Sequence, residues 1–237
     1  MSTSSMNNTD IEEKIQVVQK EYAPFLVSEA LRLEVIKLSV DKPFTWASGY
    51  KMPIYNDNRK FLQSAKIRKH IVKAFSSLMK ELNYEPDAIA GTATAGIPHA
   101  TSLADFCSLP LSYVRQSNKT HGLCNVIEGL GKEGSYNGKE VLVIEDLIST
   151  GSSSINACQA VREAGGKVSY CFAIFSYGMQ KSYDAFAELK PSCKPISIIT
   201  YDFMLEEALK IGYIKEKELS ILKSWKASPF TWWEERK

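Results

Sequence analysis

The most informative segment of the chain reads Val141-Leu-Val-Ile-Glu-Asp-Leu-Ile-Ser-Thr-Gly-Ser-Ser-Ser154. Its first part, Val141–Ile144, is short, apolar and rich in β-branched residues, which is typical of a strand buried on both faces of a parallel sheet. Glu145 and Asp146 follow at the carboxyl end of this strand, where open α/β sheets bind their ligands. The small residues Ser149–Ser153 then lead into a helix, so their backbone N–H groups can approach an anion. Carboxylates can accept hydrogen bonds from sugar hydroxyl groups, and backbone amides can bind a phosphate. The two features side by side therefore indicate that the ligand is a sugar phosphate.

Strands and helices alternate on both sides of this segment. Short apolar runs predict strands, and apolar residues at helical spacing predict helices. The predicted strands are 88–91, 111–115, 141–145, 168–175 and 196–199, and the predicted helices are 65–82, 97–106, 153–164 and 180–189, with two more within 202–225. This alternation predicts an α/β fold with a mostly parallel central sheet flanked by helices.

The N-terminal part of the chain has a different pattern. Residues 1–9 are polar and are expected to form a disordered tail. Residues 10–40 show helical spacing and are predicted as two helices divided at Pro24, because proline interrupts a helix. Residues 44–62 mix aromatic and polar side chains and are predicted as strands and turns. We therefore expect one domain over 10–237, with elements within about 10–62 packed over the sheet as a small hood.

Composition narrows the class of protein. With 44% hydrophobic residues, 24% charged residues and a net charge of +2, the chain has no bulk signal for nucleic acid or membrane binding. The five cysteines are scattered and form no C-x-x-C pair, which favours a reducing compartment. The N-terminus lacks the apolar core of a signal peptide, so a cytoplasmic protein is expected. The isolated His70 and His99 are predicted to be structural or surface residues.

A second turn of small residues, Gly91-Thr-Ala-Thr-Ala-Gly-Ile-Pro98, joins another predicted strand to a helix. Such a turn alone is more often a plain connection than a ligand site. Two of them at the same edge of one sheet could hold two phosphate groups of one ligand, one at each helix N-terminus.

The span between residues 116 and 138 is polar, rich in glycine and long for a connection within a compact domain. We interpret its middle as a flexible hairpin or lid. Arg115, Lys119 and His121 lie at its start. These residues either form an ordinary solvated basic loop or give the lid the positive charge to cover an anionic leaving group.

Aromatic and polar residues also concentrate in Phe44-Thr-Trp-Ala-Ser-Gly-Tyr-Lys-Met-Pro-Ile-Tyr-Asn-Asp-Asn-Arg59. A pair of core strands would account for the aromatic residues. It would not account for Asp57, Asn58 and Arg59 directly after them. A flat polar ring, held between aromatic walls by directed hydrogen bonds, is the functional alternative.

The segment 141–154 resembles the phosphoribosyl pyrophosphate signature of type I phosphoribosyltransferases. Together with Phe44–Arg59, Gly91–Ala100 and Tyr113–Gly129, it is similar to the orotate phosphoribosyltransferase family, in which these motifs occur in this order. The resemblance covers roughly residues 20–226. It implies the type I phosphoribosyltransferase fold and the conversion of orotate and phosphoribosyl pyrophosphate, with Mg²⁺ carried by the substrate, into orotidine 5′-monophosphate and pyrophosphate for UMP biosynthesis.

The resemblance also implies residue roles. Glu145 and Asp146 would contact the ribose hydroxyls, and Lys119, His121 and Arg115 would act with Asp146 in catalysis. The 5′-phosphate of phosphoribosyl pyrophosphate would contact Ser149, Thr150, Gly151, Ser152 and Ser153. Its pyrophosphate would contact Thr94, Ala95 and Gly96. Orotate would contact Ser48, Gly49, Lys51, Tyr55 and Arg59. The lid Arg115–His121 would reach the neighbouring subunit's site, which makes the protein an obligate homodimer.

The chain departs from some family members, which carry lysine at the positions of Ala47 and Ala95 and a cation at Gln116. The substrate anions would then depend more on backbone amides, on Lys51 or Arg59, and on Lys119. Two alternatives stay open: a phosphoribosyltransferase for another base, and a non-catalytic regulator that senses phosphoribosyl pyrophosphate on the same fold. The regulator should carry a basic face or an added helix-turn-helix for nucleic acid.

Overall fold

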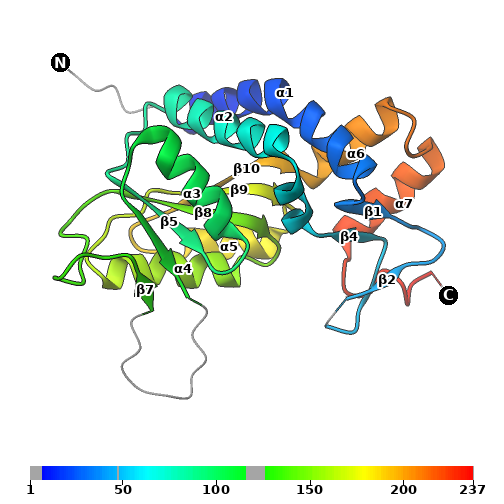
Figure 1. Cartoon of the computed structure of the whole chain (residues 1–237). Coiled ribbons are helices and arrows are strands. Elements are labelled where there is room, and N and C mark those ends of the chain that lie inside the picture. Colours follow the sequence, from blue (N-terminus) through cyan, green and yellow to red (C-terminus); the bar gives the residue numbers. More distant parts are fainter. Residues whose placement is uncertain (1–6, 47, 116–125, 237) are drawn as a thin grey trace.

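A computed structural model of the protein describes residues 7–46, 48–115 and 126–236. Its centre is a six-stranded sheet in the order β10-β9-β8-β5-β6-β7 (Figure 1). The strands are β5 (Ala88–Thr92), β6 (Leu111–Val114), β7 (Ile127–Glu128), β8 (Val141–Ile148), β9 (Tyr170–Ser176) and β10 (Lys194–Thr200). All neighbouring pairs are parallel except β6 and β7, which are antiparallel. The predicted mostly parallel α/β sheet is confirmed.

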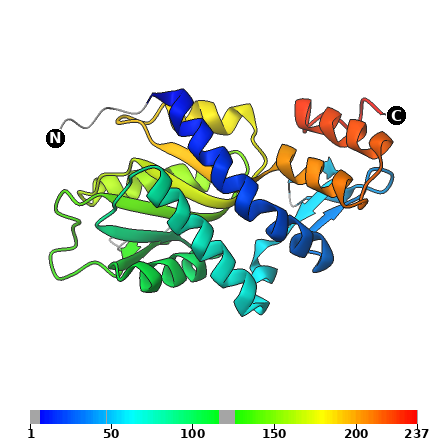
Figure 2. The same cartoon turned by 90° about the horizontal axis from the view of Figure 1, so that it is seen from above.

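Helices cover both faces of this sheet (Figures 1 and 2). One face carries α1 (Asn8–Arg32), α2 (Ala65–Glu81) and α3 (Gly96–Cys107), and the other carries α4 (Ser152–Glu163) and α5 (Gln180–Ala187). Each face has its own buried apolar cluster. Within the described ranges, no helix combines the length and the apolar character needed to cross a membrane.

Strand β8 lies in the middle of the sheet because its first residues are apolar on both faces. Val141, Leu142, Val143 and Ile144 are fully buried between β5 and β9. The pairing with β9 continues to Ile148, which is opposite Ser176. Glu145 and Asp146 therefore lie inside the strand near its carboxyl end, and the prediction that the strand stops at 145 was wrong.

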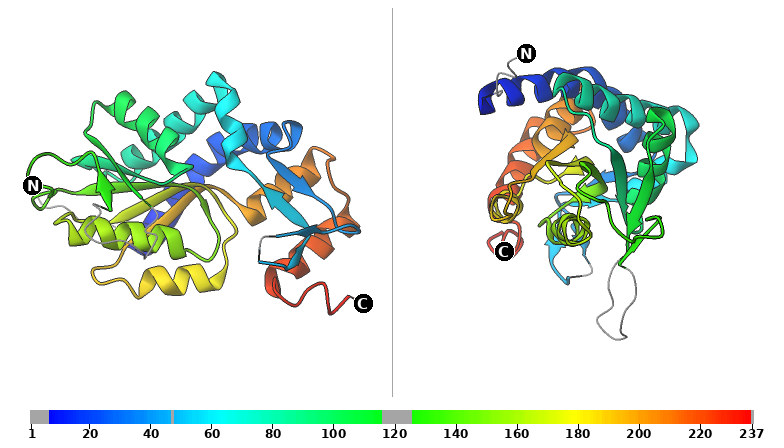
Figure 3. Two further views of the ribbon diagram at one scale, coloured as in Figure 1. Left: turned by 60° about the horizontal axis from the view of Figure 1, so that its bottom comes forward. Right: turned by 90° about the vertical axis from the view of Figure 1, so that its left-hand side faces the viewer.

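Two small antiparallel sheets lie at one end of the molecule, together with the C-terminal helices (Figures 1 and 3). The strands are β1 (Ile36–Leu38) paired with β4 (Ile54–Asn56), and β2 (Phe44–Thr45) paired with β3 (Lys51–Met52); the helices are α6 (Tyr201–Lys210) and α7 (Glu216–Ala227). The buried Trp225 of α7 donates a hydrogen bond of 3.0 Å to Met52 Sδ. We call β1–β4 and α7 the hood. The hood thus includes C-terminal residues that the sequence did not predict for it. Helix α1 was expected to belong to the hood, but most of it lies along the central sheet.

Helix α1 runs without interruption through Pro24, so the predicted division into two helices was wrong. Proline removes one backbone donor, but the neighbouring Ala23, Leu26 and Val27 are fully buried, and their packing holds the helix together. The helix also begins earlier than predicted. Asn7 Oδ1 accepts a hydrogen bond of 2.9 Å from the Asp10 amide, so the last residues of the expected tail cap and start the helix.

Candidate active site

Glu145 is a buried carboxylate held by its neighbours. Its side chain is 5% exposed. One oxygen accepts hydrogen bonds from Thr92 Oγ1 at 2.6 Å and from the Asp146 amide at 3.0 Å, and the other accepts from Ser154 Oγ at 3.1 Å. Burial, assisted by the charge of Asp146, raises the pKa of Glu145 to about 8. Thr92 and Ser154 thus connect the two small-residue turns to this carboxylate.

Asp146 is the more accessible carboxylate of the pair. Its backbone carbonyl accepts a hydrogen bond of 2.7 Å from Asn58 Nδ2, and Asn58 is 2% exposed. Burial raises the pKa of the Asp146 carboxyl, against the opposing effects of nearby hydrogen bonds and of the Arg59 charge. Asn58 belongs to a 3₁₀ helix, η1 (Asn58–Gln63), which directly follows strand β4 of the hood. This contact joins the acid pair to the hood.

The turn after β8 is open to an anion. Gly151 has φ +85°, a left-handed conformation that favours glycine, and α4 starts at the next residue. No side chain caps α4, so its first backbone N–H groups are directed out of the helix end. Ser152 and Ser153 are exposed, and Ser149 and Thr150 are partly buried. These residues fit the predicted phosphate cradle.

The turn after β5 brings a second helix end to the same place. A Cβ at Gly96 would lie 2.5 Å from the Ile144 carbonyl oxygen and 2.5 Å from Thr92 Oγ1, so only glycine fits where α3 meets β8. Helix α3 also lacks a side-chain cap, and Thr94 is exposed beside its start. Two uncapped helix N-termini therefore flank the acid pair, as the two turns predicted.

A cavity of about 400 Å³ extends from these turns along α4 to the end of β6. Thr92, Ala93, Arg115 and Ser153 are among its lining residues, and the hydrogen bond from Thr92 links the cavity wall to Glu145. Arg115 follows β6 directly and forms an ion pair of 3.1 Å with Glu128 of β7. The antiparallel pairing of β6 and β7 supports a hairpin at this position. Lys119 and His121 lie outside the described residues.

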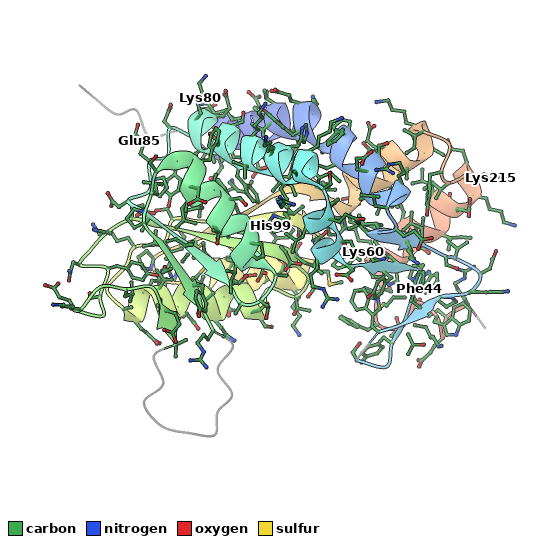
Figure 4. All side chains as sticks on the ribbon, viewed as in Figure 1. Phe44, Lys60, Lys80, Glu85, His99 and Lys215 are labelled. Carbon is green, nitrogen blue, oxygen red and sulfur yellow. The ribbon has the colours of Figure 1, made fainter. Side chains whose placement is uncertain are left out.

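The predicted orotate residues divide into two groups. Ser48, Gly49 and Lys51 are exposed on the hairpin between β2 and β3, where Trp46 donates its amide hydrogen to the Tyr50 carbonyl at 3.0 Å. Tyr55 and Arg59 lie closer to the sheet, and the Arg59 guanidinium pairs with Asp57 at 2.6 Å. Figure 4 shows the hood side chains grouped around Phe44. The structure thus places Arg59 near the acid pair and leaves Ser48, Gly49 and Lys51 at the hairpin.

Sequence reasoning missed two contributors to this site, Asn58 and Ser154. The sequence pattern places Asn58 only in a polar cluster with Asp57 and Arg59, and it places Ser154 only at the end of the segment 141–154. Their contacts cross from η1 and α4 to β8, so no local pattern could have revealed them. His99, which was predicted to be either a structural or a surface residue, is buried beside the sheet (Figure 4). Burial lowers its pKa to about 4.

The mostly parallel sheet carries an acid pair between two uncapped helix ends, and residues 58–188 match the phosphoribosyl transferase domain family, so the chain is a phosphoribosyltransferase by fold and family. The relatives narrow this class. An orotate phosphoribosyltransferase of Fusobacterium nucleatum is 47% identical over 204 residues, which cover 85% of this chain and 93% of that protein. The chain belongs to the orotate phosphoribosyltransferase family.

Solved structures agree with this fold. The orotate phosphoribosyltransferase of Aeropyrum pernix superposes with a TM-score of 0.65 at 24% identity and covers 80% of this chain and 99% of its own. The Mycobacterium tuberculosis orotate phosphoribosyltransferase in complex with phosphoribosyl pyrophosphate gives a TM-score of 0.53 at 21% identity, covering 82% and 98%. The predicted type I phosphoribosyltransferase fold is confirmed.

Proposed function

We propose that this protein transfers the 5-phosphoribosyl group from phosphoribosyl pyrophosphate to orotate, in the cytoplasm, at the site around Glu145 and Asp146. The observation that carries the proposal is the acid pair between the uncapped N-termini of α3 and α4. A donor with two phosphate-bearing ends and ribose hydroxyls between them matches this arrangement. The C1′–oxygen bond breaks, pyrophosphate leaves with the electron pair, and the deprotonated ring nitrogen of orotate bonds to C1′.

The residues act through electrostatics and position, because attack of the orotate nitrogen on C1′ requires no protein nucleophile. The sugar gains oxocarbenium character in the transition state, and the negative charge of Asp146 stabilises it. Ser149–Ser153 bind the 5′-phosphate, and Thr94, Ala95 and Gly96 lie against the pyrophosphate. The acceptor is held by Ser48, Gly49, Lys51, Tyr55 and Arg59. Arg59 directly follows Asn58, whose side chain donates to the Asp146 carbonyl, and this supports a short path from acceptor to donor.

Magnesium fits this site as a cation that arrives with the substrate. In the described part of the chain, His, Cys, Asp and Glu side chains form no cluster of three or more that could hold a metal ion. Mg²⁺ commonly binds through one or two carboxylates and substrate phosphates, and the acid pair can supply the carboxylates. When bound, Mg²⁺ would neutralise charge on the leaving pyrophosphate.

The proposed assembly is a homodimer in which the lid Arg115–His121 of each subunit reaches the partner's site. Arg115 starts the lid at the end of β6, where it lines the cavity of its own subunit, and the subunit-mixing experiment described in the Discussion tests whether the rest of the lid serves the partner. The cations of Lys119, His121 and Arg115 stabilise the leaving pyrophosphate, and closure of the lid excludes water.

A panel of bases tests the proposed acceptor. We expect wild-type protein with phosphoribosyl pyrophosphate and Mg²⁺ to convert orotate and to leave adenine, hypoxanthine and uracil unchanged, as followed by chromatography of the nucleotide products. Preferential conversion of a purine or of uracil would favour another member of the fold family.

The pH dependence of donor use should reflect the buried acid pair. Ribose hydroxyls donate hydrogen bonds to ionised carboxylates, and the pKa of Glu145 is raised to about 8, so kcat/KM for phosphoribosyl pyrophosphate should fall as the pH drops below about 8. An acid pair with ordinary pKa values would lose activity only near pH 4 to 5. In Glu145→Gln, this fall in kcat/KM at low pH should be weaker, whereas titration of the substrate phosphates affects the variant and the wild-type protein alike. If kcat/KM depended on pH in the same way in both proteins, the role of Glu145 in donor binding would be contradicted.

A further inference from the structure

The last residues of the described chain return to the hood. After α7, the segment 228–236, here called the C-terminal segment, buries Trp232 to 2% exposure, and its indole donates to Ser224 Oγ at 3.3 Å. The Arg236 guanidinium lies 4.7 Å from the centre of the Trp232 ring and donates a hydrogen bond of 3.2 Å to the Val40 carbonyl. The segment is therefore held at Trp232 on α7 and at Arg236 on the chain that leads into β2.

Between the end of α7 and Trp232, the segment touches the hairpin that carries Ser48 and Gly49. The ring of Phe230 lies 5.1 Å from the ring of Tyr50 at 60°. The Tyr50 carbonyl closes the hairpin turn by accepting the Trp46 amide hydrogen. Tyr50 and Phe230 remain 44% and 41% exposed, so this aromatic pair lies outside the core and joins the C-terminal segment to the turn.

The facing residue of the same turn, Trp46, is fixed by other parts of the molecule. The Trp46 indole donates to the Ile54 carbonyl at 2.9 Å, and its ring lies 6.3 Å from that of Trp225 and 5.4 Å from that of Tyr177. Tyr177 follows β9 of the central sheet and is buried. Trp46 on one side of the turn is thus held by the sheet and by α7, whereas Phe230 contacts Tyr50 on the facing side.

We propose that the C-terminal segment is a positioning element for orotate, acting on the hairpin through the contact of Phe230 with Tyr50. This inference rests on the proposed function. A hairpin already held in its binding arrangement loses less conformational freedom when orotate binds, so affinity is higher. The donor site is built from β5, β8, α3 and α4, to which the C-terminal segment contributes none of the contacts described above. Changes in the C-terminal segment should therefore alter the KM for orotate and leave the KM for phosphoribosyl pyrophosphate unchanged.

Steady-state kinetics of Phe230→Ala tests the proposal. Loss of one aromatic pair should raise KM for orotate between about twofold and about tenfold, with KM for phosphoribosyl pyrophosphate unchanged. Phe230→Tyr keeps the aromatic ring, so its KM for orotate should equal that of the wild-type protein. Tyr213→Ala removes an equally exposed ring, 45% exposed, from the turn between α6 and α7 and should change neither constant.

A double-variant cycle tests whether Phe230 acts through Tyr50. In a Tyr50→Ala background, Phe230→Ala should add no further rise in KM for orotate. An unchanged KM for orotate in Phe230→Ala, an equal rise in both KM values, or full additivity with Tyr50→Ala would each overturn the proposal. A wild-type protein that does not use orotate would instead refute the proposed function, so the two failures are distinguishable.

Discussion

Replacement of Asp146 by Asn is expected to lower kcat at least about tenfold, with the fold intact. Asparagine keeps the size of the side chain but removes the negative charge that we propose stabilises the developing oxocarbenium centre. The hydrogen bond from Asn58 goes to the backbone carbonyl of this residue, so it survives the substitution. Initial rates at saturating orotate and phosphoribosyl pyrophosphate measure the effect.

Asp105→Asn is the matched control for this experiment. It makes the same chemical change at an exposed position of α3, away from the acid pair, and should leave kcat unchanged. Equal melting temperatures of the three proteins would separate chemistry from stability. A near-wild-type kcat for Asp146→Asn would mean that the charge of this residue does not take part in transfer.

Replacement of Lys119 by Ala is expected to cut kcat at least about tenfold as well, because a cation over the leaving pyrophosphate is lost in the transition state. KM for orotate should change much less than kcat, since the lid acts on the donor. Lys132→Ala, which removes a lysine between β7 and β8, serves as the control. If Lys119→Ala retained the wild-type kcat, the proposal of a catalytic lid would have to be abandoned.

Mixing the Asp146→Asn and Lys119→Ala proteins, each with strongly reduced activity, tests whether the two subunits share their sites. A heterodimer of Asp146→Asn and Lys119→Ala subunits has one site with both residues intact, so statistical exchange should restore about one quarter of the wild-type activity. Mass spectrometry of the intact dimers would verify that exchange took place. No recovery despite exchange would show that the lid serves its own subunit.

Much of the sheet could be predicted because its signals are local. A fully buried central strand must be apolar throughout, so Val141–Ile144 marks β8 without reference to the rest of the chain. Runs of small residues after β5 and β8 likewise mark tight turns into helices. These two patterns were enough to predict the acid pair and the two helix ends around it.

The remaining features depend on contacts between distant residues. The pairing of Ile148 with Ser176 extends β8, the contact of Trp225 with Met52 brings the C-terminus into the hood, and burial of its neighbours carries α1 through Pro24. None of these contacts leaves a periodic trace in the sequence. Asn58 is the clearest case in the site, because its partner Asp146 lies 88 positions away.

The most direct test of orotate transfer at this site follows the absorbance of orotate over time. We expect orotate to be consumed when wild-type protein, phosphoribosyl pyrophosphate and Mg²⁺ are all present, with pyrophosphate released in equal amount. Omission of the donor or of the metal ion should stop the reaction. Binding of phosphoribosyl pyrophosphate without any loss of orotate would contradict the account and favour a non-catalytic sensor on this fold.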